Sequence, residues 1–266
     1  VILKGGESIE AIIDTIAHET QHLIGTLDHG GEGLRRYAWV DILICSNGSR
    51  SGLKVGRDSS NDAGYVSGYN ATLVSATVNS GGCLSCGYGQ LTSTVVNSDG
   101  VAYLSSGSAT AATVNGGSFH LRQATLVSAT VSNGGVLTLF TGSVSSATVN
   151  SASIMVSGSS SYLTDIKVIN GGTIDVANVG TRIENCSFSG SGRVDVYHTY
   201  LNTFSAADGA TVTFRGGSAN GMTLNNARMY IHSGGVVSGL TLTSGGYASI
   251  KEWTYGYSRC SWYRCF

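Results

Sequence analysis

The sequence SATVNSGG at residues 75–82 recurs as SATVSNGG at residues 128–135 and as SATVNSAS at residues 146–153. Looser copies lie at residues 93–100, 111–117, 166–172 and 240–246. The central apolar residues of the whole series are Val78, Val96, Val114, Val131, Val149, Val168, Phe188, Phe204, Leu224 and Leu242. Their mean spacing is about 18 residues, which is too short for a pair of helices and typical of one rung of a β-solenoid.

A second set of apolar residues repeats in the same register. After each Gly-rich stretch comes a triplet in which two apolar residues flank a variable one, as in residues 137–139 (LTL), 174–176 (IDV) and 194–196 (VDV). Side chains alternate faces along a strand, so the flanking residues point inward and the middle residue points to solvent. We therefore expect an all-β fold, a parallel β-solenoid of about ten 18-residue rungs over residues 66–250. Parallel crossovers favour a right-handed coil.

The repeat pattern also resembles that of a known family. The order V-N-S-G-G, then an apolar strand, then S-x-x-T-V, is similar to the AIDA-type repeats in passenger domains of self-associating autotransporter adhesins, and the resemblance covers residues 66–247. It implies a secreted or surface-displayed bacterial rod used for adhesion. The implied partner is a protein or glycan on a cell surface, or another copy of the chain.

Composition excludes several other classes of protein. The 266 residues include 38 glycines, no proline and 12% charged residues, with a formal net charge of −1. The absence of proline suits long strand ladders, since proline removes a backbone donor. The near-zero charge provides no electrostatic footprint for nucleic acid, and no apolar run is long enough for a transmembrane helix. The chain begins at Val1 without a signal-type segment, so we expect a mature piece or a fragment.

Residues 1–40 differ from the repeats. Ser8 is a suitable N-cap, and apolar residues recur with helical spacing over residues 8–27, which predicts an amphipathic helix. Such a helix has a plain structural role, which is to cap the exposed end of the solenoid core. Residues 41–65 are expected to form a transition segment between this cap and the solenoid.

The same helix contains the motif H-E-x-x-H, in which two histidines one turn apart bind zinc and the glutamate activates water. The string continues as H-E-x-x-H-x-x-G-x-x-D and so resembles the metzincin pattern in its aspartate variant. That resemblance implies His18, His22 and Asp28 as zinc ligands and Glu19 as the general base. Glu32 is a rival third ligand.

Three interpretations of this motif stay open: a cap without activity, a zinc site without catalysis, and part of a secreted zinc metallopeptidase that carries a solenoid scaffold. Too few residues precede His18 to form the upper wall of a zincin cleft, and no methionine occurs before Met155. We therefore expect zinc binding at most, and no peptide hydrolysis by this chain.

Two carboxylates form the other candidate site. Asp175 and Asp195 occupy the same outward position on adjacent rungs, about 5 Å apart. They are candidates for a calcium site, or for the acid pair of a glycan-cleaving β-helix. The simpler interpretation, which we prefer, is a solvated patch balanced by nearby arginines.

Residues 251–266 are aromatic and contain Cys260 and Cys265, whose spacing allows a disulfide. A C-terminal cap is the preferred interpretation of this segment, and a glycan-binding or protein-binding platform is the alternative.

Overall fold

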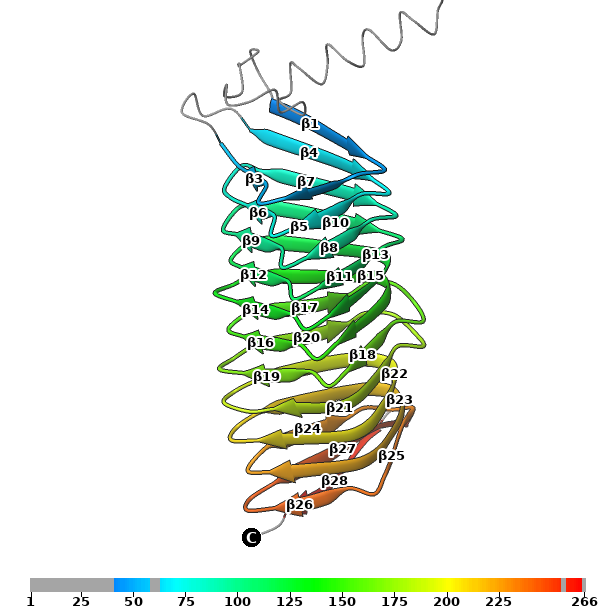
Figure 1. Ribbon diagram of the computed structural model, residues 1–266. Coiled ribbons are helices and arrows are strands. Elements are labelled where there is room, and N and C mark those ends of the chain that lie inside the picture. The colour runs from blue at the N-terminus through cyan, green and yellow to red at the C-terminus, as the bar shows by residue number, and fades with distance from the viewer. Residues whose placement is uncertain (1–40, 58–62, 255–256, 265–266) are drawn as a thin grey trace, which may run out of the picture.

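The computed structural model describes residues 41–57, 63–254 and 257–264, and these form 28 β-strands and no helix (Figure 1). Each rung contributes up to three strand segments, and equivalent segments of successive rungs pair in parallel. The molecule is therefore a parallel β-solenoid of about ten rungs with three faces, which we call the first, second and third face in chain order. In the described part of the chain, nothing has the length and apolarity of a membrane-spanning helix.

The strands group by face. The first face contains β1 (Asp41–Ser46), β4 (Gly64–Tyr69), β7 (Cys83–Gly87), β10 (Val101–Ser105), β17 (Ser153–Val156), β20 (Thr173–Val176), β24 (Arg228–Ile231) and β27 (Tyr247–Thr254). The second face contains β2 (Ser49–Ser51), β5 (Thr72–Val74), β8 (Gln90–Thr92), β11 (Ser108–Thr110), β18 (Tyr162–Thr164) and β25 (Gly235–Ser238). The third face contains β3 (Lys54–Val55), β6 (Thr77–Val78), β9 (Val95–Asn97), β12 (Thr113–Asn115), β14 (Thr130–Ser132), β16 (Thr148–Asn150), β19 (Lys167–Ile169) and β26 (Thr241–Thr243).

Some strands continue around a corner of the rod. First and second faces share β13 (Ser118–Val127) and β15 (Val136–Ser145), and second and third faces share β21 (Arg182–Phe188). All three faces share β22 (Arg193–Ala207) and β23 (Thr211–Asn225). The parallel stack begins at β1, within the stretch for which the sequence predicts a transition segment. At the other end, β28 (Tyr257–Arg264) pairs antiparallel with β27.

Left-handed backbone conformations bend the chain at the corners. Between the second and third faces, Ser75, Ser93, Ser128 and Ser146 all have φ between 53° and 59°, a region that short polar residues tolerate better than branched ones. Gly142 is more constrained. Its φ is 133°, and a Cβ there would collide with the carbonyl oxygen of Ala124 on the preceding rung. Only glycine suits that position.

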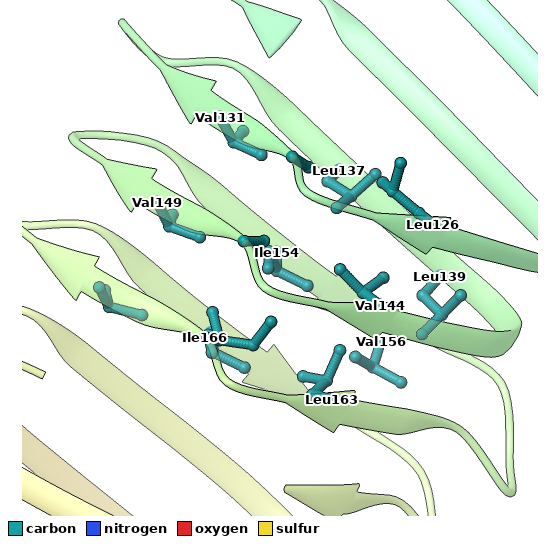
Figure 2. Close-up of a cluster of buried hydrophobic side chains, with 14 of the residues drawn as sticks. Leu126, Val131, Leu137, Leu139, Val144, Val149, Ile154, Val156, Leu163 and Ile166 are labelled. Carbon is teal, nitrogen blue, oxygen red and sulfur yellow. The ribbon is translucent and has the colours of Figure 1, made fainter. Parts of the chain in front are cut away.

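Aliphatic side chains from every rung fill the interior. The flanking residues of the triplets, such as Leu137, Ile154 and Val194, are buried and stack in the predicted register, except in the last triplet, where Ile250 is exposed. Figure 2 shows such side chains extending from successive rungs into the space between the faces. The structure thus confirms the two apolar columns. The middle positions are mostly outward-facing, although Thr213 and Ser249 are buried.

One anchor residue of the repeat series was wrongly assigned. Phe188 pairs with Ala206, which in turn pairs with Leu224, whereas Phe204 pairs with Cys186 and Met222 in a neighbouring inner column. The central third-face residue of this rung is therefore Ala206, and the spacing from Phe188 to Leu224 stays regular. The larger Phe204 fills the core beside the small Ala206, which is why the sequence pattern favoured the wrong residue.

Candidate interaction surface

Exposed apolar and aromatic side chains gather along one corner of the rod. Twelve large hydrophobic side chains are exposed in the described residues. Eight of them lie at or beside the corner between the first and second faces, and we call this set the aromatic ridge: Tyr69, Tyr88, Phe140, Tyr162, Val179, Tyr197, Tyr200 and Val236. The bends that form this corner stack along one edge of the rod (Figure 1). The ridge therefore runs lengthwise, from β4 to β25.

The third face is chemically different from the ridge. Its outward positions are mainly small polar residues, including Thr77, Thr113, Thr130, Thr148, Ser187, Ser205, Thr223 and Thr241. Nearby asparagines form hydrogen-bonded ladders, as where the Asn97 side-chain amide donates to Asn79 at 2.8 Å. The rod is thus polarised across its section, with one aromatic corner and one hydroxyl-rich face.

Aromatic pairs join consecutive rungs at and near the ridge. Tyr69 and Tyr88 meet edge to face with ring centroids 5.6 Å apart. On the adjacent first face, Tyr103 stacks on His120 with centroids 4.9 Å apart and planes inclined by 19°. Burial lowers the pKa of His120, and its Nδ1 has no hydrogen-bond partner among the described residues. Burial beside a tyrosine ring thus favours the neutral imidazole.

An arginine lies between two tyrosines at the centre of the ridge. Tyr162, Arg182 and Tyr200 are register neighbours at the start of the second face. The Arg182 guanidinium carbon lies 5.6 Å from the ring centroid of Tyr162 and 5.8 Å from that of Tyr200, distances at which a cation is attracted to an aromatic ring. All three side chains are exposed. We call this set the Tyr–Arg–Tyr ladder.

The two predicted carboxylates do meet on adjacent rungs, because Asp175 and Asp195 are register neighbours. The Asp195 carboxylate is paired with two arginines. Arg215 donates from Nε to Oδ1 at 2.9 Å and from Nη2 to Oδ2 at 3.3 Å, and Arg193 Nη2 lies 3.5 Å from Oδ2. Asp175 is exposed beside this group. The described residues contain no cluster of three or more His, Cys, Asp or Glu side chains that would hold a metal. The calcium site and the acid pair of a glycan-cleaving β-helix remain alternatives to the preferred interpretation, a solvated patch balanced by arginines.

The remaining predicted site residues lie outside the described part of the chain. These are the zinc motif residues His18, Glu19, His22, Asp28 and Glu32, and also Cys265, while of Cys260 only the backbone is described. Zinc binding and the disulfide therefore stay predictions. Four other cysteines, Cys45, Cys83, Cys86 and Cys186, have free thiols. Burial raises the pKa of each, that of Cys186 to about 12, which keeps these thiols protonated and weakly nucleophilic.

Sequence reasoning missed the aromatic ridge and the ladder. The ladder had a usable signal, because Tyr162, Arg182 and Tyr200 follow one another at spacings close to the repeat length. The rest of the ridge gave no such signal. Its members occupy different positions in their rungs, some inside strands and some at bends such as Tyr88. They become neighbours only when the corner of the solenoid is known.

The chain is similar to several solved structures but matches no known protein family. No family model matches the chain, and no curated protein matches it in sequence. Among solved structures, a fragment of TibA that was hyper-glycosylated by TibC is 20% identical to this chain. The match covers 80% of this chain and 98% of the fragment, with a TM-score of 0.43. ORF18 of Geobacillus virus E2 is 9% identical over 98% and 67% of the two chains, with a TM-score of 0.32. Trypsin-treated QnrB1, a plasmid-mediated fluoroquinolone resistance protein, is 12% identical over 76% and 92%, with a TM-score of 0.29.

Proposed function

We propose that this chain is a secreted or surface-displayed bacterial β-solenoid that acts as an adhesin-type interaction protein, with the aromatic ridge as its contact surface. The observation that carries the proposal is the gathering of exposed aromatic and apolar side chains at one corner of the rod. Tyrosine supplies large contact area at low entropic cost, and clustered exposed apolar groups mark interaction sites. The resemblance of the repeats to AIDA-type passengers supports the same function.

The two tyrosines at the centre of the ridge, Tyr162 and Tyr200, lie in strands and are held in place by the core. Tyr162 and Tyr200 alternate along their strands with buried residues, Leu163 and Leu201, which are at most 2% exposed. The backbone at these positions pairs with the rungs on both sides. A partner therefore meets side chains that are already positioned, and binding loses little conformational entropy.

Beads coated with the chain, added to cultured epithelial cells and to a panel of immobilised glycans, test this proposal. The double variant Tyr162→Ser/Tyr200→Ser should lose most of the bead attachment, because truncating central aromatic residues removes much of the binding energy of a contact surface. The matched control, Thr130→Ala/Thr148→Ala on the third face, should attach normally. Equal attachment by parent and ridge variant would refute the ridge as the contact surface.

The same proteins also test self-association, the other partner that the repeat resemblance implies. Sedimentation velocity across a range of concentrations reports whether the parent forms dimers or larger species. If the ridge contacts a second copy, the double tyrosine variant should stay monomeric at concentrations where the parent associates. If the parent is monomeric throughout, the ridge serves another molecule.

A further inference from the structure

We infer that the Tyr–Arg–Tyr ladder is a binding site for an extended acidic polysaccharide that lies along the rod, with one carboxylate of the polymer over Arg182. This inference rests on the proposed function, because it specifies the partner of the ridge. It is carried by the charge of the ladder and by its spacing.

The positive charge of Arg182 is available to a ligand. Among the described residues it is within ion-pair distance of no carboxylate, whereas Arg193 and Arg215 both contact Asp195. Its guanidinium lies between two tyrosine rings. An arginine held in this way keeps N–H groups to donate, and its planar fork matches the two oxygens of a carboxylate. The phenol hydroxyls of Tyr162 and Tyr200 add a donor or acceptor on each side.

The spacing favours a polysaccharide over a peptide. Rungs repeat at about 4.8 Å, so the two tyrosines are roughly 9.6 Å apart along the rod with Arg182 halfway between them. In an extended peptide, side chains on one face repeat at about 6.6 Å, which does not match the rungs. One pyranose unit of an extended polysaccharide is close to one rung in length. A polymer in which a uronate alternates with a neutral sugar therefore places its carboxylate at Arg182 and neutral sugars at the tyrosines.

One neighbouring group opposes an anion. Glu184 lies two residues after Arg182 on the same outward side of β21, between Thr164 and Asn202 in register. Its carboxylate repels a bound uronate without contacting it, because side chains two residues apart on a strand are roughly 6.6 Å apart. Removing that charge should therefore strengthen the binding of an acidic polymer at Arg182.

Chondroitin, an unsulfated polymer of alternating uronate and neutral N-acetylhexosamine, is the probe, with carboxyl-reduced chondroitin as the neutral control. Isothermal titration calorimetry with the full chain should show binding of chondroitin and no binding of the carboxyl-reduced polymer. Arg182→Gln should weaken chondroitin binding about tenfold or more, as expected for one lost charge-assisted contact. Glu184→Gln should strengthen it. Lys167→Gln, which removes the same charge from the third face of the neighbouring rung, should bind like the parent.

Four results would overturn the inference: no binding of chondroitin by the parent, equal binding of the neutral polymer, equal losses in the Arg182 and Lys167 variants, or equally tight binding of poly-glutamate. Circular dichroism and melting of each variant exclude misfolding as the cause of a loss. Failure here does not remove the proposed function. Bead attachment that depends on the ridge tyrosines would then remain, with a partner of different chemistry.

Discussion

Phe188 and Phe204 stack in the core with ring centroids 4.6 Å apart and planes inclined by 23°. They belong to adjacent rungs and to neighbouring inner columns, since Phe204 pairs with Cys186 rather than with Phe188. Both are at most 2% exposed. The contact links two columns diagonally, at the rung where the central third-face position holds the small Ala206. The large Phe204 thus offsets the small Ala206 in the same rung, so the core volume of the rung is kept although the side-chain size changes within each column.

Phe204→Ala should therefore destabilise the solenoid by about 3–5 kcal/mol, because Ala206 beside it leaves no side chain able to fill the cavity. The measurement is urea-induced unfolding followed by circular dichroism. Phe140→Ala is the matched control, since Phe140 is 44% exposed on the ridge and its loss should change the unfolding free energy by about 0.5 kcal/mol or less. Similar losses in the two variants would contradict this packing.

The register of the first face is tested by Val194→Asp. Val194 is fully buried between Ile174 and Val212 on the neighbouring rungs, so an aspartate there buries a charge with no partner. We expect destabilisation by several kcal/mol, roughly 4 or more, or failure to fold. Thr110→Asp, at an exposed position of β11, should melt near the parent temperature. If Val194→Asp melts like the parent, the inward column is wrongly placed.

The repeat pattern was sufficient to predict the fold, because each inner position recurs about ten times and a single irregular residue does not hide the period. It was insufficient wherever neighbouring columns share volume, as at Phe204 and Ala206. The aromatic ridge lay beyond it for a different reason. Tyr88 and Tyr197 lie beside the second face only because the chain bends at the corner, and the repeat period does not indicate where a rung bends. The charged pair Asp175 and Asp195 was found because both residues share one repeated position.

Thr94 is a weak point of the core. Its neighbours at equivalent positions are Ala76 and Ala112, and its hydroxyl oxygen is buried with no hydrogen-bond partner among the described residues. Thr94→Val keeps the volume and removes the unsatisfied group, so it should stabilise the fold by about 1 kcal/mol. Differential scanning calorimetry should record a higher Tm. A lower Tm would indicate that the hydroxyl has a partner, such as a buried water.

Stability should fall in acid through His120. Burial against Tyr103 lowers its pKa in the folded state, so the unfolded chain takes up a proton first as the pH falls. The stabilisation is complete above the unfolded pKa, near 6.5, and is lost as the pH falls through the lower folded value. His120→Phe keeps the stacking without titrating. Between about pH 8 and 5, the unfolding free energy of this variant should fall less steeply with decreasing pH than that of the parent. Identical pH profiles of the two proteins would exclude His120 as the cause.

The Asp195–Arg215 ion pair opposes the binding of calcium between Asp175 and Asp195. Both oxygens of Asp195 accept hydrogen bonds from Arg215, so a calcium ion would have to displace that arginine to be shared with Asp175. We expect millimolar calcium to leave the Tm of the parent unchanged. Arg215→Gln should cost at most about 1 kcal/mol, because both partners are partly exposed. It also leaves Asp175 and Asp195 less well compensated, so calcium should restore part of the lost Tm in this variant. A calcium-dependent rise of the parent Tm, abolished by Asp195→Asn, would instead establish a calcium site in the native protein.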